Sequence, residues 1–263
     1  MVAEGADILV VLPTLGRRLD SLQKALDSAI ASQQRRVRVV LVVPKEASEA
    51  AKLARLRGAE VVSDPGRGMS AAINAGLAAR SDEQYYIWLG DDDLYRPGGL
   101  ATLAKLLDSH PDAVVAHGAC DYVADDGSVL WVSRAGVLAR RIIGFGPNLI
   151  PHPAAMMRLD ALERVGGYDE GLKLAMDLDV LLRLRREGRF VSTTAVVSAF
   201  GWHPGSLTVA DRRASAAEAR TVKRRFLPRW MRWAEPLWEY PVAWASQIAA
   251  SRLNRRGNSE RNH

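Results

Sequence analysis

Three consecutive aspartates, Asp91, Asp92 and Asp93, directly follow a short apolar segment and Gly90. Hard divalent cations prefer oxygen ligands, and clustered carboxylates on a tight turn supply them while leaving coordination positions open for phosphate oxygens. The same triplet is also typical of a solvated acidic turn or of a helix cap before Pro97. On their own, the three carboxylates leave both interpretations open.

The segments around the triplet predict the elements that must position it. Residues 8–12 form a continuous apolar run rich in branched side chains, as expected of a parallel strand covered on both faces. Leucines and an isoleucine then recur at helical spacing. The same alternation continues, with strands predicted at 37–43, 59–62 and 85–89 and helices at 47–57 and 69–79.

This strand and helix alternation predicts a mostly parallel sheet with right-handed crossovers. Ligands of such sheets bind beyond the carboxyl ends of the strands, so Thr14 and the three aspartates are expected at the same edge. Asp177 falls in the first turn of a helix predicted over 175–186, where the helix dipole favours a carboxylate. Further elements are predicted at 100–107 (helix), 113–116 (strand), 122–131 (hairpin), 154–158 (strand) and 160–165 (helix).

The composition is that of a protein able to bury a sizeable core, with 263 residues of which 48% are hydrophobic. The apolar runs are far shorter than the roughly 20 residues needed to cross a bilayer. The first residues show no secretory signal, so a cytoplasmic location is expected. The single cysteine, Cys120, excludes an intrachain disulfide and a multi-cysteine metal cage, and is expected to be a small buried hydrophobe.

The net charge of +6 is concentrated at the C-terminus, where residues 212–263 hold 12 Lys+Arg against 4 Asp+Glu. No nucleic-acid recognition motif accompanies this charge, so nucleic acid is not expected as a partner. Cations alternate there with Trp230, Trp233, Trp238 and Trp244. Such a mixture suits a membrane headgroup layer, and equally a C-terminal helix that packs its tryptophans on the domain.

Several ordered blocks of the chain resemble the family 2 glycosyltransferases, which have the GT-A fold. SDPGRGMSAAINAG at 63–76 and YIWLGDDDLY at 86–95 are similar to the donor-binding half of that family. IPHPAAMMR at 150–158, VGGYD at 165–169 and LAMDLDVLLR at 174–183 are similar to its acceptor half. The resemblance covers roughly residues 8–208.

The resemblance implies an α/β GT-A domain, a Rossmann-like, mostly parallel sheet flanked by helices, at residues 1–211. Its nucleotide-sugar half would span 1–110 and its acceptor half 111–211, with a basic, Trp-rich helical extension at 212–263. The implied activity is inverting transfer of a sugar from a nucleotide diphosphate donor, with UDP-sugar favoured, to a hydroxyl of a glycan or lipid-linked saccharide. Mn²⁺ or Mg²⁺ would assist the transfer. The composition of the extension, and not the resemblance, leaves open either contact with the inner face of the cytoplasmic membrane or packing on the domain.

By the same resemblance, Pro13 and Thr14 begin the nucleotide pocket, and Asp64 and Arg67 contact the base or ribose. Asn74 would lie near the nucleotide, or would be a helix residue that faces solvent.

The resemblance also implies roles for the acidic turn. Asp91 and Asp92 would bind the donor. Asp92 and Asp93 would lie at the metal ion, and Asp93 would be the direct ligand of that ion. His203, in the loop after the last strand of the domain, would supply a metal contact or close over the pyrophosphate, or would be an ordinary turn histidine.

Asp177 resembles the catalytic base of the family. Asp179 is the alternative candidate for the base and is expected to contact the acceptor. Its other interpretation is a polar helix residue or a bond to Arg183. His152 would lie in the acceptor pocket, and Trp202 would stack on a sugar ring or anchor the local packing.

One departure from the family leaves the nucleobase open. Many relatives have an acidic residue after the second strand that recognises the base, whereas this chain has VPKE at 43–46. Two alternatives to a transferase also remain: a nucleotidyltransferase, for which the loop after the first strand is only faintly suited, and a catalytically inactive homologue that binds glycans.

Overall fold

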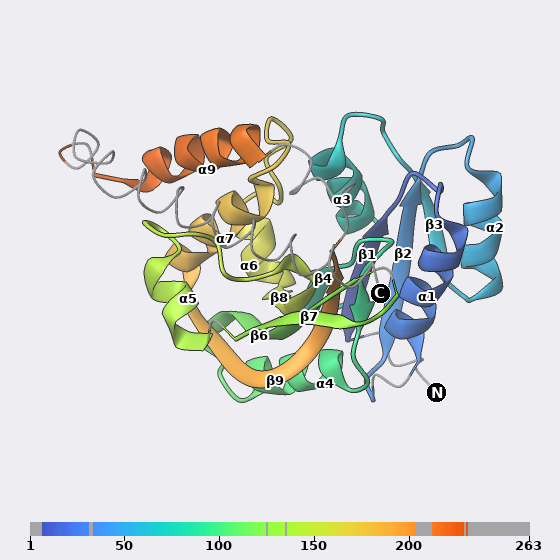
Figure 1. Cartoon of the computed structure of the whole chain (residues 1–263), viewed down its shortest axis with the longest axis horizontal. Coiled ribbons are helices and arrows are strands. Elements are labelled where there is room, and N and C mark those ends of the chain that lie inside the picture. The colour runs from blue at the N-terminus through green and yellow to red at the C-terminus, as the bar shows by residue number, and fades with distance from the viewer. Residues whose placement is uncertain are drawn as a thin grey trace, which may run out of the picture.

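A single nine-stranded sheet organises the computed structural model, which describes residues 7–31, 34–124, 126–134, 136–202, 212–228 and 230 (Figure 1). The strand order is β3-β2-β1-β4-β8-β6-β9-β5, and β7 pairs with β6 at the side of this path. Helices cover both faces. The mixed α/β class predicted from the sequence is confirmed.

The first half of the chain alternates strands with helices, as the sequence predicts. All pairings among β1, β2, β3 and β4 are parallel. The elements are β1 (Ile8–Pro13), α1 (Leu19–Ile30), β2 (Val37–Val43), α2 (Ser48–Leu56), β3 (Glu60–Ser63), α3 (Met69–Ala78) and β4 (Tyr85–Trp88).

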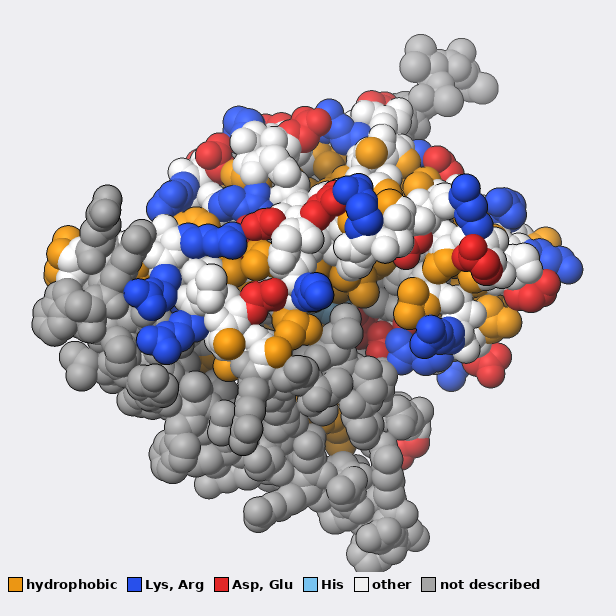
Figure 2. Space-filling view, turned by 90° about the horizontal axis from the view of Figure 1, so that it is seen from above, with side chains coloured by type: hydrophobic (Ala, Val, Ile, Leu, Met, Phe, Trp, Pro, Cys, Tyr) orange, Lys and Arg blue, Asp and Glu red, His pale blue; other side chains and the backbone are white. Residues whose placement is uncertain are grey.

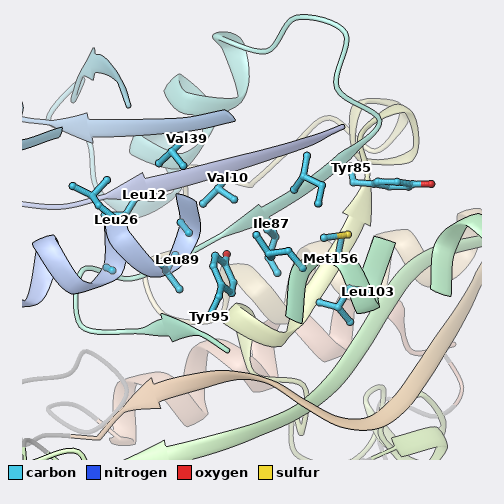
Figure 3. Close-up of a cluster of buried hydrophobic side chains, with 14 of the residues drawn as sticks. Val10, Leu12, Leu26, Val39, Tyr85, Ile87, Leu89, Tyr95, Leu103 and Met156 are labelled. Atoms are coloured by element: carbon cyan, nitrogen blue, oxygen red, sulfur yellow. The ribbon is translucent and has the colours of Figure 1, made fainter. Parts of the chain in front are cut away.

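The continuous apolar sequence of β1 is explained by burial on both sides of the sheet. Val10 and Leu12 contribute to a core with residues of α1, α2 and α4, part of which is drawn in Figure 3. Their neighbour Val11 faces the other core, formed with α3, α6 and α7. Helix α3 lies very close to this face, because a Cβ on Gly76 would be only 2.4 Å from Cγ1 of Val11.

The second half of the chain extends the sheet with both parallel and antiparallel pairs. Strand β8 is antiparallel to β4 and β6, whereas β6 and β9 are parallel. The elements are β5 (Leu94–Tyr95), α4 (Gly99–Asp108), β6 (Ala113–Val123), β7 (Val129–Ser133), α5 (Gly136–Ile142), the 3₁₀ helix η1 (His152–Ala154), β8 (Ala155–Arg158), α6 (Leu159–Arg164), α7 (Met176–Glu187), β9 (Arg189–Gly201) and α9 (Arg212–Phe226).

Strand β6 differs most from its sequence prediction. It was expected over 113–116 but continues to Val123, and its pairing with the equally long β9 is interrupted by register shifts. These irregularities interrupt the regular alternation by which a strand is recognised in a sequence. The predicted hairpin is confirmed, since Tyr122 pairs with Trp131 in the antiparallel β6 and β7. Cys120 is fully buried, as predicted.

Helix α9 packs on α7, on the side of the molecule away from α1 and α2 (Figure 1). Val222 is fully buried in this contact, and the guanidinium of Arg186 lies 4.8 Å from the ring centroid of Phe226. Lys and Arg side chains gather on this side of the face drawn in Figure 2. Among the described residues, no helix is long and apolar enough to span a membrane.

Most of the tail that follows α9 lies outside the described residues, including Trp233, Trp238 and Trp244. Trp230 is described and is 72% exposed. Contact of this tail with a membrane surface therefore stays a prediction.

Candidate functional site

A cleft opens at the carboxyl edge of β1 and β4, where the alternating fold predicts a ligand site. All three aspartates of the triplet line it, and so does Asp177 from the first turn of α7. Its walls include two cationic side chains and two aromatic rings, those of Arg18, Lys173, Trp88 and His152. The sheet edge and the start of α7 thus bring together carboxylates from sequence positions more than 80 residues apart.

Asp91 connects the ends of β1 and β4. The Thr14 hydroxyl donates to its Oδ2 at 2.5 Å, and Arg18 forms an ion pair with its Oδ1. Arg18 also reaches Oδ2 of Asp92 at 3.1 Å. Thr14 therefore lies beside the acidic turn, as the parallel sheet predicts, and one guanidinium pairs with two of the carboxylates. Pro13 lines the cleft next to it.

Asp93 is the most enclosed of the three aspartates, with 2% exposure. Nε2 of His152 lies 2.8 Å from its Oδ2, and the backbone N–H of Gly201 donates to Oδ1 at 2.9 Å. Burial disfavours the imidazolium of His152. The hydrogen bond and charge of Asp93 outweigh it, with smaller effects of Asp177 and Asp92, so the pKa of His152 is raised. Asp93 thereby joins β4, η1 and the end of β9.

Asp177 lines the same cleft and accepts a hydrogen bond from the indole Nε1 of Trp88 at 3.1 Å. Burial raises the pKa of its carboxyl, while the charge of His152 and the Trp88 bond act in the opposite direction. The Trp88 ring is stacked on His152, with centroids 3.7 Å apart and planes 9° from parallel. A continuous series of contacts therefore runs from Asp177 through Trp88 and His152 to Asp93.

The acidic turn has the donor chemistry of a site for Mn²⁺ or Mg²⁺ but is not an all-protein cage. Within the described ranges, no three His, Cys, Asp or Glu side chains converge as a ligand set. Mg²⁺ is commonly held by only one or two carboxylates together with substrate phosphates, and Asp92 and Asp93 lining one cleft fit that type of site. In this structure Arg18 pairs with Asp91 and Asp92, and His152 hydrogen-bonds to Asp93.

Asp64 and Arg67, predicted to contact the base or ribose, do not line this cleft. Oδ1 of Asp64 accepts the N–H of Gly66 at 2.8 Å and so closes the turn after β3. Arg67 is 67% exposed and pairs with Glu170 at 2.9 Å. Both side chains bond to other groups of the protein, Asp64 within its own turn and Arg67 to Glu170. Contact with a nucleotide stays a prediction for both.

Asn74 is half-buried and does not line this cleft, and its place near the nucleotide stays a prediction. Its Nδ2 donates to the backbone carbonyl of Tyr168 at 2.9 Å, and its Oδ1 accepts the N–H of Tyr168 at 3.0 Å. An amide can pair with both polar groups of one backbone residue because it carries a donor and an acceptor. Asn74 therefore ties α3 to the segment before α7, which the pattern of helix residues could not indicate.

We expect Asn74→Ala to lower the free energy of unfolding by about 1–3 kcal/mol, because two backbone groups of Tyr168 lose their partner. Urea denaturation measures this change. Thr221→Ala is a suitable control, since Thr221 is exposed and its hydroxyl bonds only within α9. An unchanged unfolding midpoint together with weaker nucleotide binding would return Asn74 to the nucleotide pocket.

Asp179 makes the ion pair with Arg183 that was the alternative to an acceptor contact, and its role toward the acceptor stays a prediction. It is 3% exposed, does not line the cleft and accepts Nε of Arg183 at 2.7 Å, one helical turn away. Trp202 likewise lies outside the cleft lining, with its ring edge-on to Tyr122 at 5.8 Å, which favours the packing role over sugar stacking. His203 lies outside the described residues, and its role at a metal or pyrophosphate stays a prediction.

Among the cleft residues with a charged or hydrogen-bonding side chain, three had not been assigned a role from the sequence: Arg18, Trp88 and Lys173. Arg18 lies in a Gly-Arg-Arg sequence, which resembles a phosphate-binding loop only weakly. Trp88 could have been found from strand alternation, which places it on the same face of β4 as Tyr86, and from its position three residues before Asp91. Lys173 carries no signal beyond its place before a predicted helix.

Solved structures with a similar fold were found by comparison. S. aureus TarS 1-349 superimposes with a TM-score of 0.59 at 16% identity, over 82% of this chain and 65% of that one. The mannosyltransferase PcManGT from Pyrobaculum calidifontis, in complex with GDP-Man and Mn²⁺, superimposes with a TM-score of 0.61 at 19% identity. The match covers 95% of this chain and 76% of that one. TarS 1-349 has also been solved with UDP-GlcNAc. The architecture is that of a GT-A glycosyltransferase domain.

Residues 9–166 match the model of glycosyl transferase family 2, and the chain belongs to this family. The chain is 30% identical over 152 residues to a curated relative, the uncharacterized protein y4gI of Sinorhizobium fredii (strain NBRC 101917 / NGR234). The matched residues make up 55% of this chain but only 16% of the relative's length. The family resemblance expected from the sequence is thus confirmed, and a nucleotidyltransferase is set aside.

Proposed function

We propose that this chain transfers a sugar from a nucleotide diphosphate donor to an acceptor hydroxyl, with inversion at the anomeric carbon. The observation that carries the proposal is that Asp177 and the Asp91–Asp93 turn line one cleft. The donor diphosphate would lie against the acidic turn and the acceptor hydroxyl against Asp177. The two reacting groups would then approach the sugar from opposite sides.

On the donor side, this chain would hold a strongly anionic leaving group. Mn²⁺ or Mg²⁺, held by Asp93 and Asp92, would neutralise the diphosphate and polarise its bond to the sugar. The guanidinium of Arg18 and the ammonium of Lys173 line the same cleft and would add positive charge there. Thr14 orients Asp91 through its 2.5 Å hydrogen bond, which keeps the turn aligned with the end of β1.

On the acceptor side, Asp177 would act as a general base. The acceptor oxygen forms a bond to the anomeric carbon while the bond from that carbon to the diphosphate oxygen breaks, and its electrons leave with the nucleoside diphosphate. The hydroxyl proton passes to a carboxylate oxygen of Asp177. Half-burial of this carboxylate strengthens its affinity for the proton, and Trp88 holds its Oδ1 in place.

The finer parts of the proposal concern the substrates. UDP-sugar is our first choice of donor, supported by the UDP-GlcNAc complex of TarS, and GDP-mannose is the second. A glycan or lipid-linked saccharide is the proposed acceptor. Contact with the inner face of the cytoplasmic membrane would come from the basic tail, most of which lies outside the described residues.

A thermal-shift panel tests the donor proposal. UDP-GlcNAc, UDP, GDP-mannose and a dTDP-sugar are compared with and without Mn²⁺ or Mg²⁺. We expect one nucleotide class to raise the melting temperature only with metal, because binding to the folded state alone stabilises it. If no nucleotide stabilises the protein under any condition, the chain is an inactive homologue or the donor site is misassigned.

Activity should fall as the pH is lowered through the raised pKa of Asp177, because only the ionised carboxylate can accept a proton. The charged and titratable groups around it are His152, Lys173, Tyr86 and Tyr168.

Trp88→Phe keeps a ring against His152 but removes the hydrogen bond that favours the charged form of Asp177. The acid limb of the kcat/KM profile should therefore move to higher pH, with activity on that limb about tenfold lower. The profiles are recorded over the range in which both proteins remain folded. Superimposable acid limbs would remove the bond from the mechanism.

A further inference from the structure

Glu218, the only acidic residue of α9, binds the backbone of the segment that leads into α7. Its Oε2 accepts the N–H groups of Leu174 at 2.5 Å and Ala175 at 2.6 Å, and its Oε1 accepts the N–H of Lys173 at 3.0 Å. These partners are 43 to 45 residues away in the sequence. Three successive N–H groups therefore converge on one carboxylate from a helix that was predicted only as a basic extension.

The bound segment is part of the candidate site. Lys173, Leu174 and Asp177 all line the cleft, and Ala175 is the residue that precedes α7. Alanine has no side-chain acceptor with which to cap its own helix, and no side-chain cap bond is present at this helix start. Glu218 supplies, from another element, an anionic acceptor for the N–H groups of residues 173–175 just before this helix start, where the positive end of the helix dipole also favours it.

Other contacts hold the same segment from either side. Arg225 of α9 pairs with Asp169 at 2.9 Å, and the hydroxyl of Ser70 on α3 donates to the carbonyl of Leu172 at 2.9 Å. Burial by itself would raise the pKa of Glu218, but the three N–H donors keep it below its ordinary value. The carboxylate is consequently the form that the segment binds.

We propose that Glu218 is a positioning residue for the transfer reaction, holding the backbone of residues 173–175 so that Asp177 faces the acceptor side of the cleft. This inference rests on the proposed function of Asp177. Helix α9 would then be part of the candidate active site, whether or not the tail that follows it contacts a membrane. A displaced base is costly because a misplacement of about 1 Å can lower a rate by about a hundredfold.

The test compares Glu218→Gln with Glu49→Gln, which removes one exposed acid from the first turn of α2, far along the chain from the cleft. Turnover is measured as release of UDP or GDP from UDP-GlcNAc or GDP-mannose, and donor affinity by calorimetry. Glu218→Gln should lower kcat by about tenfold to a hundredfold and weaken donor binding by a clearly smaller factor, because Asp91, Asp92, Asp93 and Arg18 are untouched and, of the proposed donor-side groups, only Lys173 lies in the loosened segment. Glu49→Gln should match the wild type.

Hydrogen exchange supplies a readout that does not need activity. A peptide covering 171–178 should exchange faster in Glu218→Gln, with the rest of the described sheet unchanged. Ser70→Ala, which loosens the same segment from α3, should change kcat and exchange in the same direction. These variants keep the inference testable if one of them is poorly folded.

The two proposals fail in different ways. A wild type that neither binds nor turns over any donor overturns the proposed function, while local exchange in Glu218→Gln still reports whether the carboxylate holds the segment. Wild-type kcat in a folded Glu218→Gln overturns the positioning role. A general rise in exchange, or donor affinity that falls as much as kcat, assigns Glu218 to stability alone.

Discussion

Asp177→Asn should lower turnover by about a hundredfold to ten-thousandfold while leaving donor affinity close to that of the wild type. The substituted amide has nearly the same shape, and its oxygen can still accept the Trp88 indole N–H that now lies 3.1 Å from Oδ1. It cannot accept the proton of an acceptor hydroxyl at useful pH. The effect should therefore appear in kcat, with metal-dependent thermal stabilisation by the donor retained.

Asp179→Asn is the matched control, because Asp179 is two residues away on the same helix and is the alternative candidate for the base. It should lose stability, since its carboxylate accepts Arg183 at 2.7 Å in a buried position, but the folded protein should keep its turnover. If Asp179→Asn were inactive and Asp177→Asn active, the base would have to be reassigned. Loss of donor binding in Asp177→Asn would place this residue on the donor side instead.

Asp93→Asn should have the second large effect, a loss of metal-dependent donor binding together with a decrease in activity of at least about a hundredfold. Its carboxylate is buried at the end of β4 and accepts both His152 and the backbone N–H of Gly201. The substitution removes the negative charge that a cation needs and turns one oxygen into a donor that opposes Gly201 or His152. Calorimetry with Mn²⁺ and the donor, alone and together, measures the loss.

Asp121→Asn provides the control for a buried aspartate outside the cleft. Asp121 is 8% exposed and pairs with Arg96, whose Nη2 lies 2.5 Å from its Oδ2. This variant should lose stability without losing donor affinity at temperatures where it is folded. Equal donor and metal affinity in Asp93→Asn and the wild type would contradict the assignment of Asp93 to the metal.

The sequence by itself determined the first half of the fold and the edge of the sheet at which the candidate site lies. Apolar runs such as residues 8–12 and 37–43 can be stable only if both faces are covered, which requires a parallel sheet with helices on either side. Parallel strands bring their carboxyl ends to one edge, so Thr14 and Asp91 had to meet, and their side chains lie 2.5 Å apart. Local pattern and chain connectivity suffice for such inferences.

Only the tertiary structure decided which polar side chains face the cleft and which hold the scaffold. Asn74, Asp179 and Glu218 all carry groups that suit a binding site, yet each is paired with a backbone or side-chain partner on another turn or element. Those partners are up to 94 residues away, and no local pattern encodes such a distance. The same limit applies to Trp88, whose contacts with Asp177 and His152 arise only when the start of α7 and η1 close over the end of β4.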